Sequence, residues 1–311
     1  MKTMMSVFAE ELLKEGEQDP NIIAFSADVK KSTGTGVFGD IFPERYFETG
    51  ICEQNMVGMA AGAALEGKRS VISTYASFCP GRTWEQLRCS VCLQNADVKV
   101  IGAHIGVGNG HDGPTHQCFE DIALISCLPN MRVYSPATED EVRKSVHELF
   151  SFKGPAYLRL SADFCSIIPV KTVSLSELSL LKSGNDFAVV STGAIVRMAL
   201  DVAYEFEEQT GKTLAVYDLV RLVPFNPELI SRELLRYKAV LSLEEHQLIG
   251  GFGSMIASAF AEKRKHPPLV KIGVNGKFGL SSDKTDVYEQ LGLSKKAVLS
   301  RLLETERAVR A

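Results

Sequence analysis

Short apolar runs with the length of strands alternate along this chain with longer runs that have helical periodicity. A strand followed by a helix, repeated several times, is typical of a mostly parallel sheet with helices packed on both faces. In the first half, the sequence predicts strands at 22–25, 70–75, 98–104, 131–135 and 156–160, and helices near 6–14, 52–66, 83–95, 120–126 and 139–150. Thr138 and Glu141 form a capping-box pattern that fixes the start of the last helix.

A second series of strands and helices follows an irregular stretch of short polar and apolar pieces. It predicts strands at 187–191, 214–219, 239–244 and 269–274, with helices at 195–209, after the Gly-Gly-Phe-Gly253 turn, and from a cap at Ser294. A chain of 311 residues exceeds what one core usually organises. We therefore predict two α/β domains, residues 1–165 and 186–311, joined by a linker at 166–185. Each domain is expected to be a mostly parallel sheet with helices on both faces.

Composition excludes several classes of function. A net charge of −4 offers no basic surface for nucleic acid, and no apolar run is long enough to span a membrane. Acidic residues at positions 10 and 11 come too early for a secretory signal. Seven cysteines, an odd number in apolar surroundings, predict reduced thiols and a cytoplasmic protein. The close pair Cys89 and Cys92 lies in a helical pattern without a second pair at zinc spacing, so we predict packed thiols and no metal site.

Three of the six histidines lie in one glycine-rich stretch, residues 104–117. His104, His111 and His116 share this stretch with Asp112, and its glycines and proline prevent a regular helix. The stretch follows the predicted strand 98–104, so it forms a loop at the carboxyl end of a strand, where open α/β sheets bind ligands. A surface loop with incidental histidines is the alternative. Because titratable groups are so dense here, we predict a functional site.

Glu53 begins a predicted helix that is rich in glycine and alanine. Such a helix allows a backbone or a flat ligand to approach closely, which favours a binding role for the carboxylate. A carboxylate in the first helical turn is also favourable to the helix dipole without any catalytic function. Taken alone, the position of Glu53 leaves both interpretations open.

The order of the motifs resembles the C-terminal half of transketolase along essentially the whole chain. The matching segments are Ser26-Ala-Asp28, Gly50-Ile-Cys-Glu53-Gln54, Thr74-Tyr75-Ala-Ser-Phe78, Asp112-Gly-Pro-Thr-His116-Gln117, Leu128-Pro-Asn130-Met131 and Glu244-Glu-His246. Enzymes of this family hold the pyrophosphate and divalent metal of thiamine diphosphate with a Gly-Asp-Gly…Asn motif in an N-terminal domain. This sequence contains no Gly-Asp-Gly. The resemblance therefore implies the C-terminal subunit of a split transketolase, with a pyrimidine-binding domain followed by the transketolase C-terminal domain.

The resemblance also implies roles for individual residues. Glu53 matches the glutamate that hydrogen-bonds the aminopyrimidine ring nitrogen and promotes the imino tautomer, which deprotonates the thiazolium C2. Tyr75 and Phe78 match the aromatic positions that pack on the pyrimidine, and Ile51 precedes Glu53 in the same cofactor-binding motif. The expected contacts with sugar hydroxyls are His104, His111, Asp112 and His116, while Ser32 and Lys31 are expected from their hydroxyl and charge to hold an anion. Of these, His104, Asp112 and His116 are also expected to move protons during catalysis.

The implied reaction is transfer of a two-carbon ketol unit from a ketose to an aldose. The partner subunit would carry the Gly-Asp-Gly…Asn motif and hold Mg²⁺ or Ca²⁺, in an α2β2 assembly with the cofactor at the interface. One departure concerns the substrate, because Ala162 stands where typical transketolases have an arginine for the terminal phosphate. A sugar phosphate and a sugar with another terminal group both remain open. The alternatives are the β subunit of a 2-oxo acid dehydrogenase, a 1-deoxyxylulose-5-phosphate synthase-like enzyme, and a non-catalytic scaffold.

Overall fold

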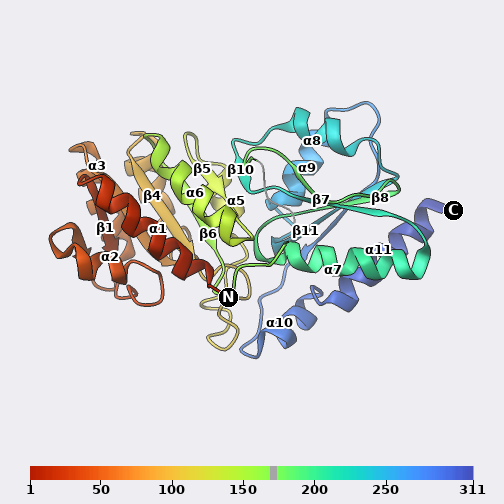
Figure 1. Cartoon of the computed structure of the whole chain (residues 1–311), viewed down its shortest axis with the longest axis horizontal. Coiled ribbons are helices and arrows are strands. Elements are labelled where there is room, and N and C mark those ends of the chain that lie inside the picture. Colours follow the sequence, from red (N-terminus) through yellow and green to blue (C-terminus); the bar gives the residue numbers. More distant parts are fainter. Residues whose placement is uncertain (169–173, 311) are drawn as a thin grey trace.

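The computed structural model describes residues 1–168 and 174–310 and contains two α/β units side by side (Figure 1). The larger sheet has the strand order β10-β5-β6-β4-β3-β1-β2, and the smaller sheet has the order β12-β11-β8-β9-β7. All pairs in the larger sheet are parallel except β10 with β5. In the smaller sheet only β7 is antiparallel to its neighbour. The predicted fold class, two mostly parallel sheets each covered by helices, is confirmed.

The first unit contains the predicted alternation of strands and helices, with a short helix, a 3₁₀ turn and a strand at 36–48 that were not predicted. Its central strands are buried along their whole length, as expected for parallel strands covered on both faces. Its strands are β1 (Ile22–Ser26), β2 (Tyr46–Glu48), β3 (Arg69–Tyr75), β4 (Val98–Ala103), β5 (Arg132–Tyr134) and β6 (Ala156–Leu160). Its helices are α1 (Met4–Gln18), α2 (Gly36–Ile41), α3 (Glu53–Leu65), α4 (Trp84–Gln86), α5 (Asp121–Ser126) and α6 (Glu139–Ser151), with a 3₁₀ turn, η1, at Pro43–Arg45. The capping box of Thr138 and Glu141 at the start of α6 is confirmed.

The helix predicted at 83–95 differs in form. After the single turn of α4, the chain continues as a π-helix, η2 (Leu87–Cys92). In a π-helix the backbone hydrogen bonds join residues five apart, which brings Leu87 and Cys92 onto one face. Both side chains are buried in the core, together with Val91. The wider turns therefore place in the core three residues that an ordinary helix would spread over a broader arc.

The second unit contains elements that the sequence pattern did not reveal. Residues 166–185, the predicted linker, include β7 (Ser179–Lys182), which pairs antiparallel with β9. Part of that predicted linker, residues 169–173, lies outside the described residues. The other strands are β8 (Phe187–Ser191), β9 (Leu214–Asp218), β10 (Arg221–Val223), β11 (Ala239–Gln247) and β12 (Leu269–Val274). The helices are α7 (Val196–Thr210), α8 (Pro227–Leu234), α9 (Phe252–Ala261), α10 (Lys284–Leu291) and α11 (Lys295–Arg310), with a 3₁₀ turn, η3, at Gly193–Ile195.

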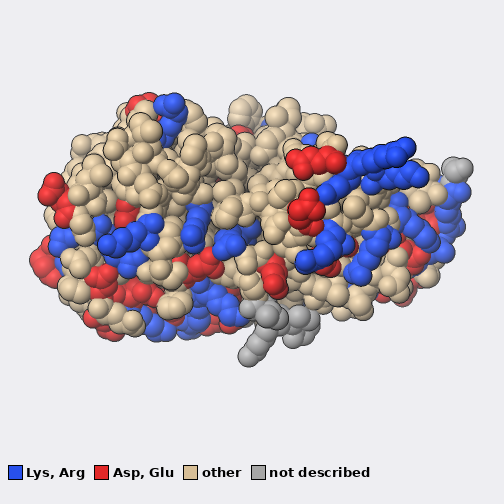
Figure 2. All heavy atoms as spheres, turned by 90° about the horizontal axis from the view of Figure 1, so that it is seen from above, with Lys and Arg blue, Asp and Glu red and all other residues tan. Residues whose placement is uncertain are grey.

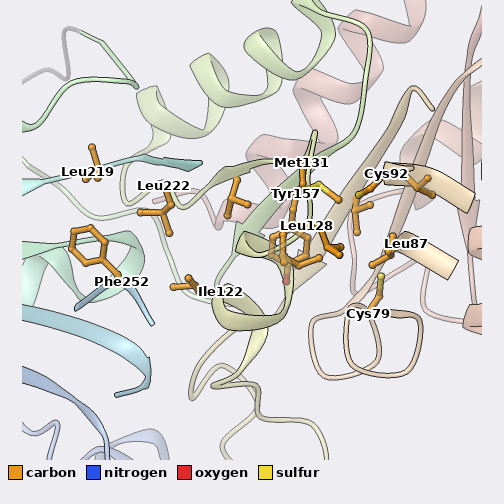
Figure 3. Close-up of a cluster of buried hydrophobic side chains, with 14 of the residues drawn as sticks. Cys79, Leu87, Cys92, Ile122, Leu128, Met131, Tyr157, Leu219, Leu222 and Phe252 are labelled. Atoms are coloured by element: carbon orange, nitrogen blue, oxygen red, sulfur yellow. The ribbon is translucent and has the colours of Figure 1, made fainter. Parts of the chain in front are cut away.

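The two units share a continuous hydrophobic core. Figure 3 shows Ile122, Leu128 and Tyr157 of the first unit in one buried cluster with Leu222 and Phe252 of the second. Strand β10 extends this contact, because it comes from the second unit but adds to the sheet of the first. The shared core fixes the second unit against the carboxyl end of the first sheet, where the histidine-rich loop lies. In the part of the chain that the structure describes, no helix is long and apolar enough to cross a bilayer.

Candidate functional site

Glu53 is the first residue of helix α3, and the outer face of this helix is exposed. The Glu53 side chain is only 2% exposed, although a carboxylate that served the helix dipole alone could remain in water. A Cβ atom added at Gly58 or Gly62 would meet nothing within 4 Å, so this face of α3 is open to an approaching surface. The carboxylate Oε2 of Glu53 accepts a hydrogen bond of 2.8 Å from Nη1 of Arg82. Glu53 is thus a buried carboxylate with an arginine partner.

Four rings gather at the carboxyl ends of β3 and β4. Tyr75 ends β3 and Phe78 follows it, with ring centroids 5.7 Å apart. The His104 ring lies 4.7 Å from that of Tyr75. The His116 ring lies edge-on to both aromatic rings, 5.7 Å from Tyr75 and 5.2 Å from Phe78. Below, these four residues are called the ring cluster.

His104 holds its place through two hydrogen bonds and an unusual backbone conformation. It follows β4 directly with a φ of +58°, in the left-handed region that few non-glycine residues adopt. Its Nδ1 lies 2.9 Å from Oδ1 of Asn109, and its Nε2 lies 3.0 Å from the backbone oxygen of Ser32. The Tyr75 hydroxyl donates to Oγ of Ser32 at 3.2 Å. Both nitrogens of His104 therefore face oxygen atoms of the protein.

His116 keeps one ring nitrogen available. Its Nδ1 lies 2.9 Å from Oγ1 of Thr115, and its backbone oxygen accepts a bond of 3.1 Å from the side-chain amide of Asn109. No hydrogen-bond partner for Nε2 of His116 is present among residues 1–168 and 174–310. Asn109 is buried and joins His104 to His116. Of the two histidines in the ring cluster, His116 is therefore the one placed to exchange a proton with a bound molecule.

The second unit holds the loop 104–117 in position. Gln117 donates to the backbone oxygen of Leu280 at 3.0 Å, and the Ser282 amide donates to the backbone oxygen of Gly110 at 3.2 Å. Gly106 has a φ of +60°, and a Cβ atom there would come within 2.9 Å of Cδ of Glu245 on β11. Only glycine satisfies both conditions at this position. The glycines of the loop thus serve close packing against the second unit.

The other predicted site residues lie apart from the ring cluster. His111 is at the exposed tip of the loop, with Nε2 3.1 Å from Oδ1 of Asp283. Asp112 is exposed beside it, and Ile51 is exposed just before α3. Lys31 lines a separate hollow of about 380 Å³ together with residues of α1. The structure therefore brings together Ser32, Tyr75, Phe78, His104 and His116, with Glu53 adjoining Phe78 through Arg82.

Sequence reasoning missed Asn109 and Arg82. Asn109 stands between two glycines of the loop, which is a weak signal for a residue that contacts both histidines. Arg82 lies four residues after Phe78, and its guanidinium carbon is 4.7 Å from the centre of the Phe78 ring. A cation one turn from an aromatic residue is a common stabilising pair. Its contact with Glu53, 29 positions away, is not readable from the sequence.

The Glu244-Glu-His246 motif lies at the seam between the units. Glu244 accepts hydrogen bonds from the backbone amides of Phe252 and Gly253 at the start of α9, and burial raises the pKa of its carboxyl to about 7. The backbone amide of Ala123, in α5, donates to Nε2 of His246 at 3.3 Å. This motif therefore caps α9 and joins it to α5. It does not enter the ring cluster.

The fold has two α/β units, and a buried carboxylate lies beside four rings at the carboxyl edge of the larger sheet, an arrangement typical of α/β proteins with a ligand site at that edge. The sequence matches the transketolase pyrimidine-binding domain over residues 1–163 and the transketolase C-terminal domain over residues 176–298. The chain belongs to the transketolase family.

Proteins of similar extent are among the relatives. A protein of Methanocaldococcus jannaschii named for a transketolase C-terminal section is 32% identical over 97% of this chain and 96% of its own length. A subunit of a 6-deoxy-6-sulfo-D-fructose transketolase from Clostridium sp. is 30% identical over 98% of this chain and 95% of that protein. A solved structure described as a split gene transketolase, an inactive β4 tetramer, superposes with a TM-score of 0.88 at 34% identity and covers 98% of both chains.

Other relatives are about twice as long. The 1-deoxy-D-xylulose-5-phosphate synthase of Carboxydothermus hydrogenoformans is 29% identical over 96% of this chain, which corresponds to 48% of the enzyme. The transketolase of Campylobacter jejuni shares the fold, with a TM-score of 0.82 at 22% identity, over 97% of this chain and 46% of that one. The chain thus spans about half the length of these relatives.

The residues present fit the pyrimidine half of thiamine diphosphate, the cofactor of the transketolase family. The guanidinium of Arg82 is planar, donates an N–H to Glu53 and lies over the Phe78 ring. A flat ring with an N–H can make the same two contacts. No group of three or more His, Cys, Asp or Glu that could hold a metal ion is found within residues 1–168 and 174–310.

Proposed function

We propose that this chain is the C-terminal subunit of a two-chain, thiamine diphosphate-dependent transketolase that transfers a two-carbon ketol unit from a ketose to an aldose. The observation that carries the proposal is the buried carboxylate of Glu53 next to the ring cluster. A carboxylate that is buried from solvent binds a ring N–H strongly, because the low local dielectric strengthens a charge-assisted hydrogen bond. The relatives of matching length support the assignment to the C-terminal subunit.

Each residue of the site has a distinct part in this proposal. When bound, the thiazolium ring of the cofactor supplies the electron sink that permits cleavage of a carbon–carbon bond beside a carbonyl. Glu53 holds the pyrimidine ring nitrogen, while Tyr75 and Phe78 pack on the ring. His116 gives a proton to and takes a proton from the substrate oxygen through its unpaired Nε2. His104, held by Ser32 and Asn109, keeps the cluster in place and contacts the substrate through its ring edge.

The partner in this proposal is a chain that carries the Gly-Asp-Gly…Asn motif, which this sequence lacks. That chain would hold the pyrophosphate with Mg²⁺ or Ca²⁺ in a cytoplasmic heterotetramer of two copies of each subunit. The exposed face of α3 and the residue just before the helix support such an assembly, because Ile51, Met59 and Leu65 are exposed. Figure 2 also shows an area of the first unit, at the upper left, where few side chains are charged. Uncharged surface of this kind favours burial against another protein.

Reconstitution tests the proposed function. We expect this chain alone to show no ketol transfer, because it lacks ligands for the pyrophosphate and metal. An equimolar mixture with the Gly-Asp-Gly…Asn chain, thiamine diphosphate and Mg²⁺ should transfer the two-carbon unit between a ketose and an aldose. Product formation is measured by chromatography of the sugars. A mixture that binds the cofactor but transfers no two-carbon unit from any donor would contradict the proposal.

Position 162 allows a prediction about the donor sugar. Ala162 follows β6, where a typical transketolase has an arginine for the terminal phosphate. A charge-assisted contact of that kind is worth about 1.5–3 kcal/mol, or about ten- to a hundredfold in affinity. We expect Ala162→Arg to raise kcat/KM for ketose phosphates by about this factor in the reconstituted enzyme. The Clostridium relative, named for a sulfo-sugar, supports the idea that the terminal group varies in this family.

The matched control is Ala257→Arg, a substitution on α9 in the second unit. It adds the same charge away from the ring cluster and should leave kcat/KM unchanged. The comparison uses phosphorylated and unphosphorylated donors with the wild type and both variants. A wild type that already prefers the phosphate, together with no gain in Ala162→Arg, would mean that Lys31 or the partner subunit holds the anion.

A second candidate function is 1-deoxyxylulose-5-phosphate synthesis. The observation that favours it is sequence identity of 28–31% with such synthases over nearly the whole chain, against 20–22% for the single-chain transketolases of known structure. A 1-deoxy ketose ends in a methyl ketone, so its two-carbon unit comes from decarboxylation of a 2-oxo acid. Release of CO₂ from a 2-oxo acid by the reconstituted enzyme, without ketol transfer, would favour this candidate.

A further inference from the structure

We propose that the Arg82 guanidinium occupies the place of the pyrimidine ring in the free subunit. The Arg82 side chain then moves away from Glu53 when thiamine diphosphate binds. The inference rests on the proposed function in one respect, namely that this cofactor binds beside Glu53. It assigns to Arg82 a role in subunit stability and in cofactor affinity.

The contacts of Arg82 match those that the flat ring requires. Nη1 donates to Oε2 of Glu53 at 2.8 Å, and the guanidinium carbon lies 4.7 Å from the centre of the Phe78 ring. A guanidinium is planar and carries N–H donors at its edge, so it can satisfy a carboxylate while it stacks on an aromatic face. The cofactor ring and the guanidinium cannot both donate to Oε2 of Glu53 and lie against the same face of Phe78. One must therefore displace the other.

The Arg82 side chain can move out of the site, whereas the Glu53 side chain cannot. The Arg82 side chain is 50% exposed, so rotation carries its charge into water at little cost. Its backbone stays tied to α3, because the Gln54 side chain donates to the Arg82 backbone oxygen at 3.1 Å. The Glu53 carboxylate is buried and stays in the site. The pair can thus open by movement of one side chain without rearrangement of the backbone.

The pair also explains how the free subunit tolerates a buried carboxylate. Across the described residues, no second hydrogen-bond partner of the Glu53 side chain is found besides Arg82. A buried carboxylate without a partner is strongly destabilising. Arg82 therefore stabilises the free subunit, and the same contact competes with the cofactor in the assembled enzyme. Removal of the Arg82 guanidinium should therefore lower the stability of the free subunit and raise the cofactor affinity of the assembled enzyme.

The test uses Arg82→Met, which keeps an apolar side chain against Phe78 but removes every N–H donor. Arg88→Met is the matched control, because Arg88 is exposed on η2 and, among the residues that the structure describes, its side chain hydrogen-bonds only to Sγ of Cys89, at 3.3 Å. The first readout is the Kd of thiamine diphosphate with Mg²⁺ for the reconstituted two-chain complex, by calorimetry. The second is the Tm of the free chain, measured in the wild-type background and again with Glu53→Gln.

We expect Arg82→Met to lower the Kd of the complex about three- to tenfold, since half-exposed ion pairs are modest in strength. The Tm of the free chain should fall in Arg82→Met and should fall less when Glu53→Gln is present. Arg88→Met should change neither quantity. A Kd that rises or stays the same in Arg82→Met, in a complex whose wild type binds the cofactor, would overturn the inference. Failure of the wild-type complex to bind thiamine diphosphate would instead overturn the proposed function, and the inference with it.

Discussion

Replacement of Glu53 by Gln should lower kcat of the reconstituted enzyme by about 10²–10⁴-fold, the usual contribution of a positioned group that promotes proton transfer. Gln has nearly the same shape but no charge, so it cannot hold a ring N–H as an ionised carboxylate does. The loss should appear in kcat more than in cofactor affinity. Steady-state rates with a ketose donor and an aldose acceptor measure the first quantity, and calorimetry with thiamine diphosphate measures the second.

Exchange of the thiazolium C2 proton with deuterium, followed by NMR in the reconstituted complex, tests the same prediction before any substrate is added. The exchange should slow in Glu53→Gln in step with kcat. Glu66→Gln is the control, because Glu66 is an exposed carboxylate at the opposite end of α3. Unchanged C2 exchange in Glu53→Gln would mean that the carboxylate serves only the helix terminus.

The second large effect concerns stability. Arg159→Met should lower the free energy of unfolding by about 3–5 kcal/mol, the usual cost of removing one partner from a buried ion pair. Asp121 is fully buried and accepts two bonds from Arg159, with Nε 2.7 Å from Oδ2 and Nη2 3.0 Å from Oδ1. The Tyr157 hydroxyl donates to the same carboxylate at 3.0 Å. Urea unfolding followed by circular dichroism measures the loss.

The same pair predicts a dependence on pH. The charge of Arg159 and its hydrogen bonds outweigh burial and hold the pKa of Asp121 below its ordinary value. A lowered folded-state pKa contributes stability that is present above the unfolded-state value, near about 4, and is lost as the pH falls further. The difference between wild type and Arg159→Met should therefore shrink in acid, where a protonated Asp121 needs no cation.

A surface pair is the control for this prediction. Arg197 and Asp201 on α7 form an exposed ion pair of 3.0 Å, and exposed pairs contribute about 0–1 kcal/mol. Arg197→Met should therefore change the free energy of unfolding far less than Arg159→Met. Equal stability of Arg159→Met and wild type would show that the buried pair does not hold α5 against β6.

Local periodicity was sufficient to predict most of the fold. Strands buried on both faces, such as β4 and β6, appear in the sequence as short apolar runs. The capping-box residues Thr138 and Glu141 predict the start of α6. Strands β2, β7 and β10 were missed, since each has only three or four residues and lacks a buried apolar run. β10 also forms by pairing with β5 of the other unit, so the residues next to it in the sequence do not predict it.

The candidate site was predictable in its residue types but not in its arrangement. Glycines and histidines in one loop, and a glutamate before a glycine-rich helix, are local signals. The two histidines differ because Asn109 and Ser32 engage both nitrogens of His104, whereas Nε2 of His116 has no partner among the described residues. The anchoring of the loop depends on contacts such as that of Gln117 with Leu280, 163 positions away. Contacts of this range are set by the packing of the two units and leave no trace in a local pattern.

The central claim is that this chain supplies one half of a thiamine diphosphate site whose other half lies on a second chain. Equilibrium binding of thiamine diphosphate with Mg²⁺, measured by calorimetry for this chain, for the Gly-Asp-Gly…Asn chain and for their equimolar mixture, tests it most directly. The account predicts tight, saturable binding by the mixture alone, with one cofactor for each copy of this chain. Tight, magnesium-dependent binding by this chain on its own would contradict it.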